Sequence, residues 1–319
     1  MKNVFITIIL LFCYTTGFSQ IIDAEKIFKT RSTDISDGWQ KGGTIILNMS
    51  QVSLTNWAAG GQNSISGNGL LSLFAHKKNG ASSWQNYLDI GYGTIKQGKK
   101  AIWWKTDDKI DFTSKYGKKA FSGWYYAGLL NFKTQMTPGY NYPDESTKIS
   151  DLLAPGYLIG AIGLDYKKND NFTAFFAPLT AKTTFVKNQT LADAGAFGVE
   201  PANYSPDGEM LSKGENIRTE FGSYIRLFYM KNLMENISMQ TKLDLFSNYL
   251  NNPQNIDISW EVLLSMKVNK YISATLSTHL LYDDDVNIAT DTDNDGITDS
   301  NGPKTQFKEV LGVGFSYKF

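Results

Sequence analysis

The chain ends with "GVGFSYKF", residues 312–319, in which large apolar side chains alternate with small or polar ones up to the last residue. Extended backwards, the alternation gives one apolar row, formed by Leu311, Val313, Phe315, Tyr317 and Phe319. The opposite row is smaller and more polar, and contains Lys308, Val310, Gly312, Gly314, Ser316 and Lys318. A period of two predicts a β-strand with two unlike faces, ordered to its final residue.

The N-terminal segment has the features of a secretory signal peptide. Lys2 precedes an apolar run over residues 4–12, and the small residues Gly17 and Ser19 follow it. These features predict cleavage after Ser19, so that residues 1–19 are removed. The only cysteine, Cys13, leaves with that segment. The mature chain therefore has no thiol, which excludes disulfides and thiol catalysis.

The charge balance argues against a nucleic-acid partner. The 319 residues include 31 Lys and Arg and 31 Asp and Glu, so no strongly basic surface is expected. After the signal segment no stretch approaches the length and apolarity of a membrane-spanning helix.

From Gly43 onward the sequence predicts about twelve long strands of alternating character. The clearest is "IDISWEVLLSMKV", residues 256–268, in which Leu263 is the one apolar side chain on the polar face. The strands are predicted at 43–54, 64–78, 84–97, 104–116, 121–136, 156–168, 172–186, 217–230, 237–250, 256–268, 271–282 and 308–319.

The connections between these strands are of two kinds. Tight turns are predicted at 79–80, 117–119, 168–171, 231–236 and 269–270, where Asn, Gly and Lys are frequent. Longer links alternate with them, at 55–63, 98–103, 137–155, 187–214, 251–255 and 283–305. Short turns at one end and long loops at the other are typical of a transmembrane β-barrel of the outer-membrane type.

A secreted soluble β-sandwich would also show alternation, but three features favour the barrel. The strands are longer than those of soluble sheets, aromatic residues gather near their ends, and the chain stops on an aromatic. An open sheet edge cannot lie in hydrocarbon, so the last strand must close onto the first, with its apolar row facing lipid. We therefore expect an all-β, closed, antiparallel up-and-down barrel over residues 43–319, preceded by a short periplasmic segment at 20–42. The expected protein is a monomer in the bacterial outer membrane, surrounded by outer-membrane lipids, with both termini in the periplasm.

Two resemblances support this expectation. Phe315, Tyr317 and Phe319 resemble the C-terminal signal by which the barrel-assembly machinery recognises outer-membrane proteins. The Gly42-Gly43 pair, "LTNWAAGGQNS" at 54–64 and "WWKTDDKIDFTSKYG" at 103–117 resemble the Bacteroidota family called domain of unknown function 3078. The family resemblance implies an outer-membrane location and brings no substrate or catalytic residues.

"DTDNDGITD", residues 291–299, is the sharpest local motif. It matches the first nine positions of a calcium loop, with side-chain oxygens at alternate positions and a glycine at the sharp turn. The twelfth position, normally Glu, is Gly302, so a complete EF-hand is absent. The predicted ligands of a weak calcium site are Asp291, Asp293, Asp295, Ile297 and Asp299; the alternative is a solvated acidic loop.

The polar strand faces predict a charged barrel interior. The side chains expected there are Asp165, Arg218, Glu220, Arg226, Lys242, Asp244, Asp257, Glu261 and Lys267. Because both signs are interspersed, mutual pairing across strands is favoured over an ion-selective channel.

No catalytic residue is predicted. His279 and Ser277 share the polar face, but residues two apart on a strand lie about 7 Å from each other, too far for a direct hydrogen bond. We expect a non-enzymatic protein that passes or binds a small solute or lipid in the manner of a porin, or that serves envelope structure. The alternatives are a lipid-modifying hydrolase and a surface adhesin with calcium-stiffened loops.

Overall fold

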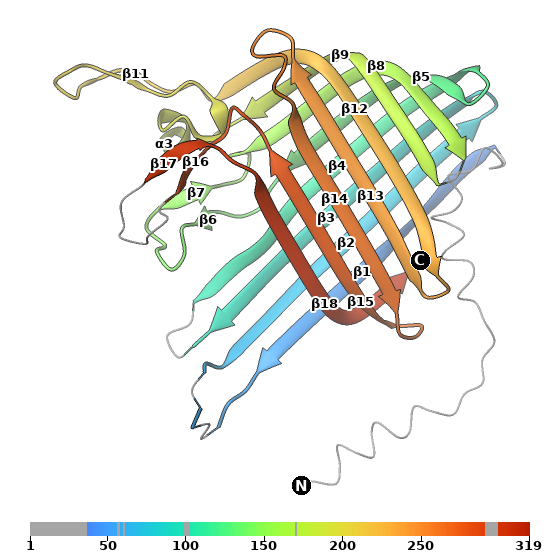
Figure 1. Ribbon diagram of the computed structural model, residues 1–319, viewed down its shortest axis with the longest axis horizontal. Helices are drawn as coiled ribbons and strands as arrows, with labels where there is room; N and C mark the ends of the chain where they lie inside the picture. The colour runs from blue at the N-terminus through green and yellow to red at the C-terminus, as the bar shows by residue number, and fades with distance from the viewer. Residues whose placement is uncertain (1–36, 56–57, 60, 99–101, 170, 291–298) are drawn as a thin grey trace.

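The computed structural model describes residues 37–55, 58–59, 61–98, 102–169, 171–290 and 299–319. It contains a closed antiparallel barrel of 12 strands, which confirms the predicted fold class (Figure 1). The barrel strands are β1 (Gly38–Val52), β2 (Ser64–Asn79), β3 (Ser82–Gln97), β4 (Trp103–Phe121), β5 (Trp124–Thr134), β8 (Gly156–Asn169), β9 (Phe172–Phe185), β12 (Ile217–Met234), β13 (Ile237–Asn248), β14 (Asp257–Lys267), β15 (Ile272–Tyr282) and β18 (Gln306–Lys318). Each strand pairs with the next barrel strand in the chain, and β1 pairs with β18.

The chain terminus closes the barrel. Ile45 lies opposite Tyr317, and the pairing continues through Thr44 opposite Lys318. A Cβ atom on Gly42 would lie 2.8 Å from the carbonyl oxygen of Phe319 and from the ring of Phe74. A glycine is therefore needed at position 42, where the first strand, the last residue and an inward-facing ring meet.

The outward face of the barrel is apolar around its circumference. Leu311 on β18, Trp260 on β14, Ile162 on β8 and Leu179 on β9 are all exposed. Aromatic rings gather where the short turns lie: Phe315 stacks between Tyr271 and Tyr317, and Tyr317 stacks on Phe319. This outward band of apolar and aromatic groups matches the lipid-facing surface of a transmembrane barrel. No helix in the described ranges is long and apolar enough to cross a bilayer.

The two ends of the barrel differ as predicted, with short turns at one end and long loops at the other (Figure 1). The first strand begins at Gly38, before the predicted Gly43, because it stays paired with β2 as far as Lys78. The predicted turn at 117–119 is wrong. Gly117 is extended and lies between Ser83 and Ala127, and the chain turns instead before Trp124, where Gly123 has a φ of 73°.

The long loops carry small elements of their own. They are β6 (Gly139–Tyr140) and β7 (Lys148–Ser150) after β5; α3 (Gln189–Asp193), a 3₁₀ turn η1 (Ala196–Gly198), β10 (Asn203–Tyr204) and β11 (Met210–Ser212) after β9; and β16 (Asn287–Thr290) and β17 (Ser300–Pro303) after β15. The first two loops share a buried apolar cluster of Ala154, Val186, Leu191, Ala192 and Val199. They therefore pack against each other as one layer at the long-loop end.

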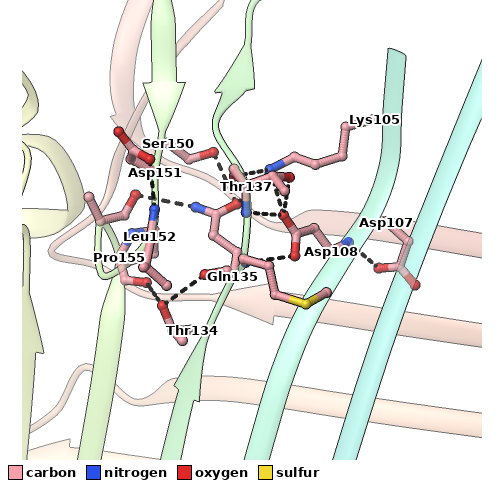
Figure 2. Close-up of polar contacts among 12 residues, drawn as sticks. Lys105, Asp107, Asp108, Thr134, Gln135, Thr137, Ser150, Asp151, Leu152 and Pro155 are labelled. Atoms are coloured by element: carbon pink, nitrogen blue, oxygen red, sulfur yellow. Dashed lines mark hydrogen bonds and ion pairs between the residues drawn. The ribbon is translucent and has the colours of Figure 1, made fainter. Parts of the chain in front are cut away.

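The loop after β5 is fastened to the long-loop end of β4 (Figure 2). The Asp108 carboxylate accepts hydrogen bonds from the backbone N–H of Met136 at 2.8 Å and from that of Thr137 at 2.9 Å. Lys105 binds the same carboxylate at 3.1 Å and donates to the carbonyl of Thr137 at 2.8 Å. Gln135 extends the network by donating to the carbonyl of Ala154. This attachment holds the start of the loop in one position.

Candidate solute site in the barrel interior

Strand alternation directs a large set of charged side chains into the barrel interior, where they gather at three levels. We call these the mouth cluster (Lys182, Arg218, Glu220, Asp257, Asp283, Asp285), the central cluster (Lys109, Asp111, Lys133, Arg226, Lys242, Asp244, Glu261) and the turn-end cluster (Lys115, Asp165, Lys167).

The mouth cluster lies beneath the long loops. The Lys182 ammonium is 2.5 Å from a carboxylate oxygen of Asp257 and 3.1 Å from one of Asp283. Arg218 pairs with Glu220 at 2.9 Å and with Asp285 at 3.0 Å. Carboxylates outnumber cations in this cluster, four to two.

The mouth cluster is also covered by loop backbone. Gly198 has a φ of 77°, and a Cβ there would lie 2.5 Å from the Arg218 guanidinium. The loop after β9 therefore packs against an inward-facing cation. The contact at Gly198 places this loop against the mouth of the barrel.

The central cluster joins opposite walls. Arg226 on β12 binds Asp244 on β13 through two nitrogens, at 2.6 and 3.0 Å. Lys242 on β13 lies 2.8 Å from Glu261 on β14 and 3.3 Å from Asp111 on β4. Because β4 is not a neighbour of β13, the last pair crosses the interior.

One side of the interior is filled. Below the mouth cluster, side chains of β5, β8, β9, β12 and β13 form a buried apolar cluster of Ala127, Leu129, Ala161, Phe175, Ala177, Tyr224 and Phe246. The Tyr224 hydroxyl donates to Asp244 at 2.8 Å, which links this packing to the central cluster. In the turn-end cluster, the Lys115 ammonium forms an ion pair with the Asp165 carboxylate at 2.8 Å.

The other side of the interior is hollow. A cavity of about 440 Å³ extends along β1–β4, β15 and β18 and reaches the central cluster. Its wall combines apolar groups such as Ile46, Leu70 and Phe74 with charged groups such as Asp89, Lys109 and Lys308. Lys308 is 2.6 Å from Asp107 across this space. The cavity is therefore bounded by apolar groups together with charges of both signs.

Most of the side chains predicted to lie inside take part in these clusters. Asp165, Arg218, Glu220, Arg226, Lys242, Asp244, Asp257 and Glu261 all form ion pairs. Lys267 points inward opposite Ser273 but forms no ion pair within the described ranges. The sequence reasoning missed Lys109, Asp111, Lys133 and Lys182, although alternation along "KIDFTSK", residues 109–115, carries the same signal as on the other strands.

His279 has a serine partner that sequence reasoning did not identify. Its Nε2 lies 3.0 Å from the hydroxyl of Ser259 on the adjacent strand β14, whereas Ser277 shares its own strand. Glu261 is the register partner of His279, but its carboxylate is bound by Lys242 at 2.8 Å. Among the described residues no carboxylate is hydrogen-bonded to the imidazole, so a complete nucleophile–base–acid set is not assembled there.

Most of the predicted calcium loop lies outside the residues that the structure describes. Asp291, Asp293, Asp295 and Ile297 lie outside the described residues, and Asp299 directly precedes β17. Within the described ranges, no group of three or more His, Cys, Asp or Glu side chains is arranged to hold a metal ion.

Residues 49–140 match the model of the family described as "Protein of unknown function (DUF3078)". The match includes two of the segments that carry the resemblance found in the sequence, 54–64 and 103–117. No curated protein matches the chain.

Several solved barrels align with most of the chain at low identity. An outer-membrane channel from Pseudomonas putida F1 is 8% identical, covers 89% of this chain and 97% of its own, and has a TM-score of 0.39. The translocator domain of the autotransporter NalP from Neisseria meningitidis is 10% identical, covers 96% and 100%, and has a TM-score of 0.33. A mutant of the TodX monoaromatic hydrocarbon channel is 11% identical, covers 89% and 90%, and has a TM-score of 0.30.

Proposed function

We propose that this chain is an outer-membrane barrel that admits small polar solutes through its interior. The observation that carries the proposal is the cavity of about 440 Å³ between the hollow wall and the central cluster. A closed barrel with an apolar exterior and a charged, partly hollow interior is the arrangement of a membrane passage. Paired charges and the loop layer make this passage narrow, so large solutes are excluded.

The central cluster gives this passage weak selectivity. Its cations and carboxylates neutralise one another, and Asp89 adds a carboxylate to the cavity wall beside them. A solute that enters therefore meets positive and negative side chains within a few ångströms of each other. This favours small solutes that can exchange hydrogen bonds with either sign over simple anions or cations.

Planar-bilayer recording of the purified, refolded protein tests the proposal. Wild type is expected to give small, weakly selective conductance steps. The double variant Lys109→Ser/Glu261→Ser removes a pair that borders the cavity, 3.7 Å apart, without changing net charge. It is expected to raise the conductance at least twofold, and the outward variant Val313→Ala is the control. Silent traces from wild type and from the double variant would reject a passage.

The Ser259–His279 contact is the specific observation that favours the hydrolase alternative. The two functions are separated by an assay of phospholipid hydrolysis in mixed micelles. We expect no fatty-acid release by wild type; release that His279→Ala abolishes would establish the enzyme in place of the passage.

A further inference from the structure

The lipid-facing wall contains a hollow that is distinct from the interior. It is an apolar groove of about 650 Å³ over β4, β5, β8, β9 and β12. Two rows of register partners form it. One row is Phe221, Ala181, Gly160, Leu130 and Ser114, and the second is Leu179, Ile162, Gly128 and Tyr116. We call this hollow the outer groove.

Two glycines of the outer groove, Gly128 and Gly160, have no structural requirement of their own. Neither Gly128 nor Gly160 has a positive φ. A Cβ on Gly160 would meet nothing within 4 Å, and one on Gly128 would only reach the carbonyl of Ala161 at 4.0 Å. Glycine weakens a strand, and it is common where a ligand approaches the backbone closely. These two positions therefore keep the groove open.

A β-bulge at Pro178 in β9 shapes one edge of the groove. Pro178 lies within β9 and interrupts its hydrogen-bond ladder, because a proline has no N–H to donate. The register shifts on both sides of it, between Ile162 and Leu164 on β8 and between Gly222 and Tyr224 on β12. A bulge of this kind bends the strand. The carbonyl of Pro178 is bound by the Tyr249 hydroxyl at 3.2 Å, which fixes the edge of the groove.

The dimensions of the groove fit one leaflet of a bilayer. Each row crosses up to five neighbouring strands, so it extends about 19 Å at the usual strand spacing. With strands tilted by about 40°, that length rises about 12 Å along the membrane normal. Half of the hydrocarbon core measures about 15 Å. One row runs from Phe221, near the long-loop start of β12, to Ser114 on β4. The other row runs from Leu179 on β9 to Tyr116, nearer the short-turn end of β4.

A cation lies at the lower end of the groove. Lys118 follows Tyr116 on the outward side of β4, is exposed, and is the register partner of Tyr126, whose ring is also exposed. An ammonium group and a phenol hydroxyl at the edge of an apolar band suit the phosphate of a phospholipid. The charge lies at the short-turn end, where β1 begins and β18 ends.

We propose that the outer groove binds one acyl chain of a phospholipid in the leaflet next to the short turns, with the lipid phosphate against Lys118 and Tyr126. The groove supplies an apolar channel open to the surrounding hydrocarbon, and the cation supplies selectivity for an anionic headgroup. This site is independent of any passage through the interior.

Native mass spectrometry of the full protein with added phosphatidylglycerol tests the proposal. Wild type is expected to retain one lipid after release from detergent. Gly160→Leu fills the groove and is expected to lower retention at least tenfold. Ala274→Leu, an outward small side chain on the opposite wall between Met266 and Val313, is the matched control and is expected to retain the lipid. A heat-dependent gel shift verifies that each variant is folded.

Lys118 provides the second test, because it leaves the groove itself unchanged. Lys118→Gln is expected to lower phosphatidylglycerol retention several-fold, and Lys118→Arg to restore it. Equal retention by wild type and Gly160→Leu would overturn the proposal. The proposal would also be overturned if wild type were a dimer and Gly160→Leu made it a monomer. The groove would then be occupied by a second copy of the chain. If Lys118→Gln retained as much phosphatidylglycerol as wild type, the placement of the lipid phosphate against Lys118 would be overturned.

Discussion

Phe319 and Gly43 exchange two backbone hydrogen bonds: the Phe319 N–H donates to the Gly43 carbonyl at 3.0 Å, and the Gly43 N–H donates to the Phe319 carbonyl at 2.9 Å. The last residue of the chain thus completes the seam between the last strand and the first. An unpaired seam would leave polar backbone groups in hydrocarbon, which costs several kcal/mol for each group.

Removal of Phe319 is therefore expected to impair barrel formation. The deletion loses both backbone bonds and the ring that stacks on Tyr317. The yield of folded protein, measured by the heat-dependent gel shift after refolding into vesicles, is expected to fall several-fold. Leu311→Ala, an outward substitution higher on the same strand, is the control. The same variants report on the proposed assembly signal of Phe315, Tyr317 and Phe319, since recognition by the assembly machinery would add a defect in cells beyond that in vitro.

Loss of one partner from the central cluster is expected to be costly. Arg226→Met leaves the Asp244 carboxylate, whose side chain is 9% exposed, with Lys133 at 3.7 Å as its one remaining ion-pair partner among the described residues. Removing one member of a buried pair typically costs about 3–5 kcal/mol. Urea unfolding in vesicles measures this loss. The double variant Arg226→Met/Asp244→Asn is expected to lose less than Arg226→Met alone; an equal or larger loss would contradict the pairing.

The loop after β5 is expected to loosen in acid. The Lys148 ammonium, 2.6 Å away, holds the pKa of Asp151 below its ordinary value. A carboxyl with a lowered pKa contributes stability above its unfolded pKa of about 3.9, and that contribution is lost as the pH falls through the folded pKa. Carbon-13 NMR titration of the Asp151 carboxyl is expected to show a higher pKa in Lys148→Met than in wild type. An unchanged pKa would show that the pair does not form.

Calcium is expected to stabilise the loop that contains Asp291, Asp293 and Asp295. Bound calcium holds one loop geometry, so a chelator should lower the melting temperature by a few degrees. Asp293→Asn removes one predicted ligand charge and should abolish the effect. If a chelator did not change the melting temperature, the calcium site would be rejected and the loop would be a solvated acidic loop.

Much of the fold follows from alternation in the sequence. A strand with one apolar face can be placed in only one way, with that face outward and the polar face inward. The misplaced turn at 117–119 has a local cause. Gly117 resembles a turn residue, yet β4 continues beyond it because Lys118 still pairs with Tyr126 and the turn falls at Gly123. Turn chemistry alone could not distinguish these two glycines.

The interior was only partly predictable. Alternation identifies which charges point inward, as for Arg226 and Asp244. It cannot identify partners such as Lys182 and Asp257, which come from strands that are not neighbours. Such pairs depend on strand tilt and stagger, which are properties of the closed barrel and not of any one segment. The Ser259–His279 contact was missed for a different reason: it joins neighbouring strands, and it depends on the register between β14 and β15.

The one-sided packing of the interior has a mechanical consequence. The buried apolar cluster comes from β5, β8, β9, β12 and β13, whereas β1, β2 and β3 contribute to the cavity wall and to no part of that cluster. We therefore expect the barrel to deform more easily on the side of the cavity than on the packed side. That side also contains the seam where the first and last strands meet.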